Sequence, residues 1–297
     1  MISELALLFA AAPIEFHLSA AAILGLLVGS FLNVVILRFP PRMEFAWRQE
    51  AASILENDLK PEFELGAAPP SLVWEPSHCP KCGFKLQPWH NIPVISYLLL
   101  RGRCSCCKTP ISAMYPLVEA FTAALSVLVI WHFGPSLQGF AALVLTWVLI
   151  AASGIDSRTQ YLPDEFTLGL LWLGLMAALV PLFVSPKDAI LGAIFGYLSL
   201  WSVYQLYKLV RGIEGMGFGD FKLLAALGAW VGWQKLLLIV LLSALAGTLF
   251  ALTRMLIGKH SSEQPMPFGP FLAAAGWVSL LYGEPIVQWY LRFSGVE

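Results

Sequence analysis

The sequence has few charged residues. Only 12% of its 297 residues are Asp, Glu, Lys or Arg, whereas soluble domains carry about 25%. Hydrophobic residues make up 58% of the chain, and its mean hydropathy is +0.73. This composition excludes an ordinary soluble domain and predicts an integral membrane protein.

Other signals are also missing. The first hydrophobic segment has no basic region before it and no small-residue cleavage site, so we expect a retained helix rather than a signal peptide. No whole-domain repeat is visible. No Gly-x-Gly-x-x-Gly motif is present either, so the sequence shows no dinucleotide-type cofactor fold.

The apolar segments predict an all-α polytopic protein with about eight transmembrane helices. A short segment, Phe221 to Val231, is one of them. Seven are long enough to span a hydrocarbon layer of roughly 30 Å, and they lie near Ile14 to Leu37, Tyr115 to Phe133, Leu137 to Ile155, Glu165 to Val184, Asp188 to Leu209, Gln234 to Ile257 and Phe268 to Leu291. All but three of the 18 Lys and Arg residues then fall on one side, which predicts cytoplasmic loops and two periplasmic termini.

A polar insert separates the first two helices. We divide the chain into a first transmembrane helix at 1–38, a cytoplasmic insert at 39–112 and a seven-helix membrane domain at 113–297. The first part of the insert is charged and predicts a short helix and a loop. Its second part contains all five cysteines.

The cysteines form a Cys-x-x-Cys pair that is followed by a second one. Cys79 and Cys82, with Cys104 and Cys107, have the spacing of a four-thiolate structural zinc site. Cys106 is spare, and it is an alternative ligand to Cys104 or Cys107. A closed site of this kind would fold the insert rather than catalyse.

Two other interpretations of the cysteines remain open. Disulfides are disfavoured because the topology places the insert in a reducing compartment. A catalytic thiol would need a base, for which His78 and His90 are nearby, but the sequence shows no third group to orient it.

Asp220 begins an apolar helix after three glycines at 215, 217 and 219. Glycine permits positive φ and the close approach of another chain segment, and we expect both here, with room for an extended substrate to reach Asp220. An ionisable residue at membrane depth is costly, which indicates function. The alternative is an N-cap, a position that Asp favours.

Asp156 ends another apolar segment, at the same predicted depth as Asp220. Two aspartates that share a site do not both ionise readily, so one would keep a proton while the other activates water. Lys222 and the helix amino terminus would favour an ionised Asp220, whereas burial would favour a neutral one. The sequence leaves open which aspartate is the base.

Two further acids are candidates. Asp164 is expected as the N-cap of the fourth helix, with a supporting catalytic role as the alternative. Glu119, one turn into the second helix, is expected to pair with Arg38 or with a base of the insert. The break at 265–270 is either a turn or a wall of the active cavity, and the Gly-x3-Gly spacings at 25–29 and 192–196 predict close helix packing.

In order along nearly the whole chain, six motifs resemble the type IV prepilin peptidases. These motifs are Gly29-Ser-Phe-Leu-Asn33-Val-Val-Ile-Leu-Arg38, the two cysteine pairs with Asn91-Ile-Pro93 between them, Tyr115-Pro-Leu-Val-Glu119, Asp156, Gly217-Phe-Gly-Asp220-Phe-Lys222 and Pro267-Phe-Gly-Pro270.

The resemblance implies a bifunctional enzyme of the bacterial inner membrane. Such enzymes remove the short basic leader of type IV prepilins and type II secretion pseudopilins at the cytoplasmic boundary, usually between Gly and Phe. They then methylate the new amino terminus with S-adenosylmethionine. The resemblance implies no nucleic-acid partner, and it leaves the oligomeric state open.

The resemblance also assigns residues. The catalytic aspartates fall on Asp156 and Asp220, with Gly217, Gly219, Lys222 and Asp164 in support. The zinc ligands fall on Cys79, Cys82, Cys104 and Cys107, and the glycine associated with methyl transfer falls on Gly102. We expect Asn33, Arg38 and Glu119 to join Gly102 in binding the methyl donor.

Three alternatives compete with this function. A proton-coupled transporter would use Asp156 and Asp220 as relay groups, but no inverted repeat is visible. A zinc-binding scaffold for pilus machinery would leave the buried acids unexplained. A peptidase without methyltransferase activity is the third.

Overall fold

The computed structural model describes residues 12–54, 66–212, 216–257 and 266–295. Within them the chain is α-helical, with no β-strand and only two isolated β-bridges, as the composition predicts. Its contacts divide it into two units, Met1–Leu128 and Val129–Glu297, each of which is described by itself.

In the described part of the chain, six helical segments are long and apolar enough to cross a membrane, and they contain α2, α4, α5, α7, α9 and α10. The protein is therefore a multi-pass membrane protein. Helices α6 and α8, with 16 and 14 residues, fall below that length. The count of eight spans stays a prediction.

The first unit contains α2 (Ile14–Ile54), η1 (Pro88–Asn91), α3 (Ile95–Leu99) and the start of α4 (Met114–Phe133). The expected end of the first helix near Leu37, with a separate short helix after it, is wrong. Helix α2 continues through Pro40 and Pro41, because the residues that follow are mostly good helix formers. Part of the expected loop, 55–65, lies outside the described residues.

Helices α2 and α4 pack closely at two glycines, as the Gly-x3-Gly spacing predicts. A Cβ atom at Gly25 would lie 2.6 Å from Cα of Ala123, and one at Gly29 would lie 2.7 Å from Cα of Glu119. A larger side chain at either position would force the two backbones apart.

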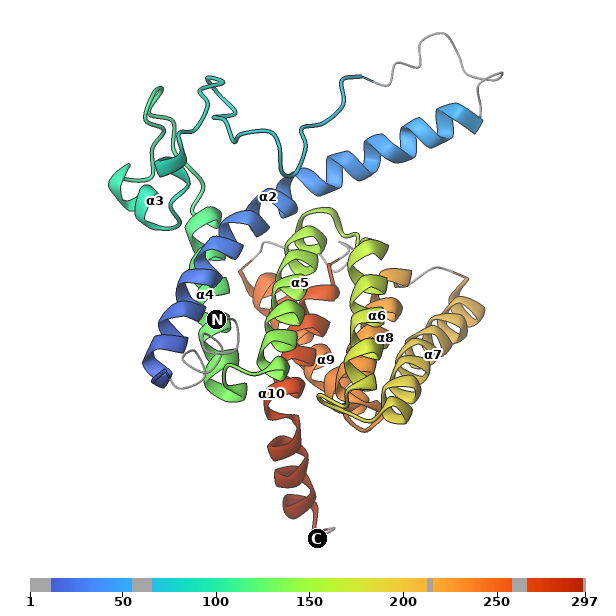
Figure 1. Ribbon diagram of the computed structural model, residues 1–297. Coiled ribbons are helices and arrows are strands. Elements are labelled where there is room, and N and C mark those ends of the chain that lie inside the picture. Colours follow the sequence, from blue (N-terminus) through green and yellow to red (C-terminus); the bar gives the residue numbers. More distant parts are fainter. Residues whose placement is uncertain (1–11, 55–65, 213–215, 258–265, 296–297) are drawn as a thin grey trace. The chain divides into compact units, whose positions relative to one another are not determined.

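The second unit contains α5 (Leu137–Thr159), α6 (Asp164–Leu179), α7 (Pro186–Arg211), α8 (Phe218–Val231), η2 (Trp233–Lys235), α9 (Leu236–Leu256) and α10 (Gly269–Ser294). Helix α8 packs against α6, α7 and α10 (Figure 1). Every residue of α8 from Asp220 onward except Lys222 is buried, which explains why the helix is apolar on nearly all sides.

Two glycines of α7, Gly192 and Gly196, bring this helix close to α8. Gly192 and Gly228 meet backbone to backbone, and a Cβ at Gly196 would lie 2.6 Å from the Leu224 carbonyl oxygen. The second Gly-x3-Gly spacing is thus also confirmed as a packing feature.

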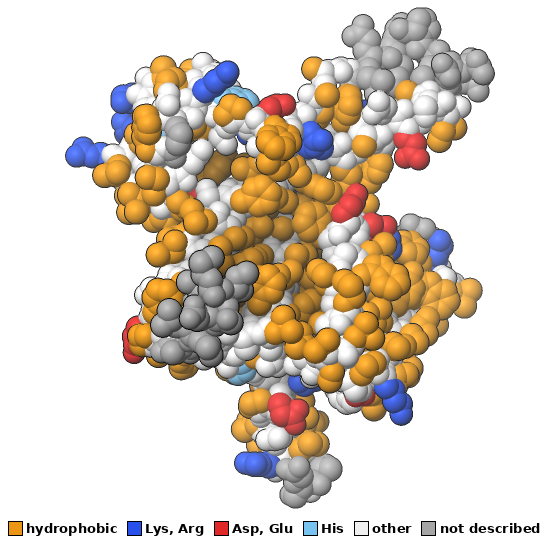
Figure 2. All heavy atoms as spheres, viewed as in Figure 1, with side chains coloured by type: hydrophobic (Ala, Val, Ile, Leu, Met, Phe, Trp, Pro, Cys, Tyr) orange, Lys and Arg blue, Asp and Glu red, His pale blue; other side chains and the backbone are white. Residues whose placement is uncertain are grey.

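The outer surface of the helices is hydrophobic. Figure 2 shows hydrophobic side chains over most of the face that it presents, with charged groups few and scattered. Leu198 and Leu206 of α7, and Leu237, Leu241 and Leu245 of α9, are all exposed. Such faces suit a hydrocarbon solvent rather than water.

Candidate active site and metal centre

Asp156 and Asp220 lie at two helix ends of the second unit. Asp156 is in the last turn of α5 and Asp220 in the first turn of α8, and the two residues are only 4% and 8% exposed. The two carboxyl groups interact electrostatically. A third helix end joins them, because the Gly269 N–H at the start of α10 donates to Oδ2 of Asp156 at 3.0 Å.

The N-cap interpretation of Asp220 is wrong. Gly217 is the N-cap of α8, and Asp220 is the third residue inside the helix. The expectation of positive φ also fails in the described glycines, since Gly217 has φ −78° and Gly219 is helical. Gly215 lies outside the described residues. Capping therefore does not explain a buried acid here.

Leu162 explains why glycines are needed near the two aspartates. A Cβ atom at Gly219 would lie 2.7 Å from Cβ of Leu162, and one at Gly269 would lie 2.9 Å from Cδ1 of Leu162. The same Cβ at Gly269 would lie 2.7 Å from Oδ2 of Asp156. Sequence reasoning gave Leu162 no role. It treated Gly269 as part of a break that is either a turn or a wall of the active cavity, and the contact of Gly269 with Asp156 favours the second.

We expect Gly219→Ala to reduce peptide cleavage because the new methyl group would displace Leu162 or the start of α8. A displacement of about 1 Å near reacting groups can cost about 100-fold in rate. The matched control is Gly169→Ala in α6, where a Cβ meets nothing within 4 Å. Steady-state cleavage rates of the two variants make the comparison, and equal rates would show that the Leu162 contact is unimportant.

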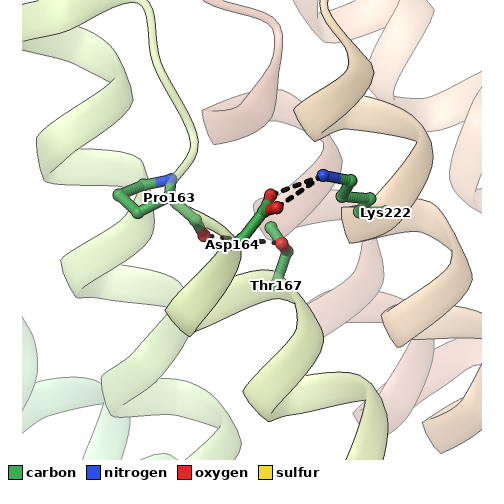
Figure 3. A network of polar contacts seen from close by, with 4 residues as sticks. All are labelled: Pro163, Asp164, Thr167 and Lys222. Carbon is green, nitrogen blue, oxygen red and sulfur yellow. Dashed lines mark hydrogen bonds and ion pairs between the residues drawn. The ribbon is translucent and has the colours of Figure 1, made fainter. Parts of the chain in front are cut away.

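Asp164 and Lys222 form an ion pair beside this site. Figure 3 shows Lys222 directed at the carboxylate of Asp164, with Nζ 2.6 Å from Oδ1 and 2.7 Å from Oδ2. Pro163 is the N-cap of α6 and Asp164 its first residue, so the expected N-cap role of Asp164 is wrong. Lys222 has Asp164 as its partner rather than Asp220.

The four predicted cysteine ligands come together in the first unit. The Sγ atoms of Cys79, Cys82, Cys104 and Cys107 all lie within 4.8 Å of one another, in an arrangement that can hold a metal ion. Cys106 is exposed and outside this cluster. The structure therefore favours Cys104 and Cys107 over Cys106 as the ligands from the second motif.

Each cysteine pair lies in the same kind of turn. An antiparallel bridge joins His78 to Lys85 around the first pair, and another joins Arg103 to Pro110 around the second. The fifth residue of each turn, Gly83 or Lys108, has positive φ. Its N–H donates to the carbonyl of the first cysteine in the turn, so two short similar loops present four thiols to one point.

Two of these thiols favour the thiolate form that binds metals. The hydroxyl and backbone N–H of Thr109 lower the pKa of Cys107 to about 6. The backbone N–H groups of Cys82 and Lys81 lower the pKa of Cys79. Desolvation and the thiols of Cys107, Cys79 and Cys104 raise the pKa of Cys82 to about 12, so metal binding would still release the proton of that thiol.

The residues expected to bind a methyl donor are only partly brought together. Asn33 donates to the carbonyl groups of Gly29 and Tyr115, which places it on the α2 face that packs against α4 near Glu119. Its Oδ1 atom is buried without a hydrogen-bond partner in the described part of the chain.

Glu119 and Arg38 do not pair, contrary to expectation. The Glu119 carboxylate instead accepts a hydrogen bond through Oε2 from the Val94 N–H of the insert at 2.7 Å. Arg38 donates to the carbonyl groups of Ser71 and Glu75. Gly102, with φ +65°, packs against the Tyr97 hydroxyl. Arg38 and Gly102 thus organise other parts of the insert.

Two aspartates in shared buried surroundings can divide the roles of acid and base, as in aspartic peptidases. Fold and site therefore match a membrane-embedded class of such peptidases. The chain belongs to the type IV leader peptidase family, which matches residues 143–252. Residues 23–133 match the bacterial peptidase A24 N-terminal domain.

Similar proteins carry one name, prepilin leader peptidase/N-methyltransferase. The protein of that name from Pseudomonas aeruginosa is 52% identical over 285 residues, which cover 96% of this chain and 97% of that protein. The one from Xanthomonas campestris pv. campestris is 51% identical over 278 residues, covering 94% and 96%. No solved structure matches the chain. Family membership favours a peptidase over the transporter and scaffold alternatives.

Proposed function

We propose that this enzyme cleaves the leader peptide of prepilins and then methylates the new amino terminus. The observation that carries the first activity is the buried pair of Asp156 and Asp220, assembled from α5 and α8 with the Gly269 N–H on Asp156. One carboxylate would activate water against the scissile carbonyl, while the protonated partner would pass a proton to the leaving amine.

The location of the pair suits such a substrate. Prepilins carry a basic leader before an apolar helix, so their scissile bond lies where that helix enters the membrane. Asp156 and Asp220 lie at helix ends rather than mid-helix. We propose that these ends face the cytoplasm, with both termini periplasmic and the protein in the inner membrane. The three-part division at 38 and 112 and the cleavage of secretion pseudopilins are proposals too.

For the cysteine cluster we propose structural zinc. In a tetrahedral zinc–thiolate site with bonds of about 2.3 Å, two sulfurs lie about 3.8 Å apart. The Sγ atoms of Cys79 and Cys107 are 3.8 Å apart, so this pair already has the separation of two zinc ligands, and all four Sγ atoms lie within 4.8 Å of one another. Four cysteine ligands leave no open position, and the ion would hold the two turns of the insert together.

For the methyl donor we propose the first unit, with Asn33, Arg38, Gly102 and Glu119. S-adenosylmethionine supplies a methyl group from a cationic sulfonium centre. The unpaired Oδ1 of Asn33 on α2 and the carboxylate of Glu119 on α4 are oxygen acceptors. Two such oxygens suit a cationic ligand. Arg38 and Gly102 would shape the insert around it.

One experiment tests both activities. Purified enzyme is incubated with a prepilin, with and without S-adenosylmethionine, and the product mass is measured. We expect loss of the leader in both samples and an additional 14 Da, about the mass of one CH₂ group, only with the methyl donor. Cleavage without a mass increment would leave the peptidase alone, and an intact prepilin would refute the proposal.

A further inference from the structure

The ion pair between Asp164 and Lys222 joins the start of α6 to the start of α8 (Figure 3). The two side chains are 47% and 25% exposed. Ion pairs that water reaches contribute little to stability. The pair therefore contributes little to the free energy of folding, and we look for its effect in the position of the two helices that it joins.

That geometry bears on Asp220. Successive residues of an α-helix advance by about 100°, so residues two apart, such as Asp220 and Lys222, project toward nearly opposite sides of α8. Lys222 is attached to α6, whereas Asp220 is buried and within electrostatic range of Asp156. A contact that holds Lys222 on one side of the helix therefore sets the direction of Asp220 on the other.

The far end of α8 is attached to the same helix. Trp230 donates from Nε1 to the Leu170 carbonyl at 2.9 Å, and its ring lies against Gly174. Helix α6 thus holds α8 near both of its ends. The ion pair is the attachment nearer to the carboxylate, only two residues from it.

The residue before Asp164 is hydrogen-bonded into the first turn of α6. The Pro163 carbonyl accepts from the Thr167 N–H at 3.2 Å and from the Thr167 hydroxyl at 3.4 Å (Figure 3). Two residues before Asp164, Leu162 fills the space beside Gly219 and Gly269. The segment from Leu162 to Asp164 therefore contacts α8 and the α10 end that hydrogen-bonds Asp156.

We propose that Asp164 and Lys222 are positioning residues for the aspartate pair, which fix the rotation of α8 so that Asp220 faces Asp156. The inference rests on the proposed peptidase function. Neither residue exchanges a proton with the substrate in this role. Loss of the ion pair would leave substrate binding intact and lower the fraction of enzyme in which the two carboxyl groups are aligned.

The test compares kcat and KM for prepilin cleavage among Asp164→Asn, Lys222→Met, the double variant and Lys222→Arg. We expect each single charge removal to lower kcat about tenfold with KM within about twofold. The double variant should be no slower than either single one, because both remove the same contact. Lys222→Arg keeps the charge and should stay close to wild type.

Glu44→Gln is the matched control, since it removes the carboxylate of another exposed ion pair, with Arg48 on α2. Methylation of an already cleaved pilin reports whether each variant is folded. A single variant that fails to fold is replaced by the double one, which leaves neither charge unpaired.

Four results would each overturn the inference. They are an unchanged kcat in the single variants, a loss of kcat in the double variant equal to the product of the single losses, a change in KM alone, and a low kcat in Lys222→Arg. Wild-type enzyme that fails to cleave would instead refute the proposed function.

Discussion

Asp156→Asn and Asp220→Asn are each expected to abolish leader cleavage, with kcat reduced on the order of 1,000-fold. An amide is nearly the same size as a carboxyl group but neither takes up a proton from water nor donates one as an acid. Both residues are buried, at helix ends of the same unit, so in the proposed pair loss of either leaves the other without its partner. Product formation from a purified prepilin is the measurement.

The matched control is Asp188→Asn. Asp188 is at the start of α7, where its carboxylate accepts hydrogen bonds from the Ser185 hydroxyl, Trp233 and Gln234, near the opposite end of α8 from Asp220. We expect this variant to cleave at close to the wild-type rate. Methylation of a pre-cleaved pilin should persist in Asp156→Asn and Asp220→Asn. Normal cleavage by a folded Asp220→Asn enzyme would exclude the aspartate pair as the catalytic group.

Cys104→Ser is expected to release the bound metal and to abolish N-methylation. A serine hydroxyl does not replace a thiolate as a zinc ligand, and the two cysteine turns of the insert would lose the ion that joins them. Gly102, the glycine assigned to methyl transfer, is two residues from Cys104. Metal content by elemental analysis and methyl transfer to a cleaved pilin are the two readouts.

Cys106→Ser provides the control, because Cys106 is exposed and outside the cluster. We expect it to retain one metal ion per chain and normal methylation. A Cys104→Ser enzyme with full metal content would show that the cluster is not the metal site. Full methylation after complete metal loss would show that the insert keeps its fold without the ion.

Much of the architecture followed from local patterns. Hydrophobic segments specified the helices because a bilayer leaves the backbone little alternative to helical hydrogen bonding. The spacing of the cysteines predicted a cluster because each pair closes its own short turn. Gly192 and Gly196 predicted a close helix contact, and they mark the line where α7 meets α8.

Other features depended on contacts that no local pattern encodes. Helix α2 continues through Pro40 and Pro41 to Ile54, beyond its expected end near Leu37. Asp164 was expected as a cap and Lys222 as a neighbour of Asp220, yet the two residues pair with each other across 58 positions of sequence. Glu119 accepts from the Val94 backbone rather than from Arg38, because this part of the insert contacts the first turns of α4.

By itself the sequence determined that this is a helical membrane protein with two cysteine pairs at the spacing of a metal site. It also predicted a function for Asp156 and Asp220, and it left open whether Cys106 is a ligand. Those properties depend on composition and on spacing within a few turns. Only the tertiary structure decided that Leu162 lies between Gly219 and Gly269, that Gly269 holds Asp156, and that Lys222 is attached to α6. The physical reason is that these contacts form where separate helix ends converge, and the packing of α8 among its neighbours determines that convergence.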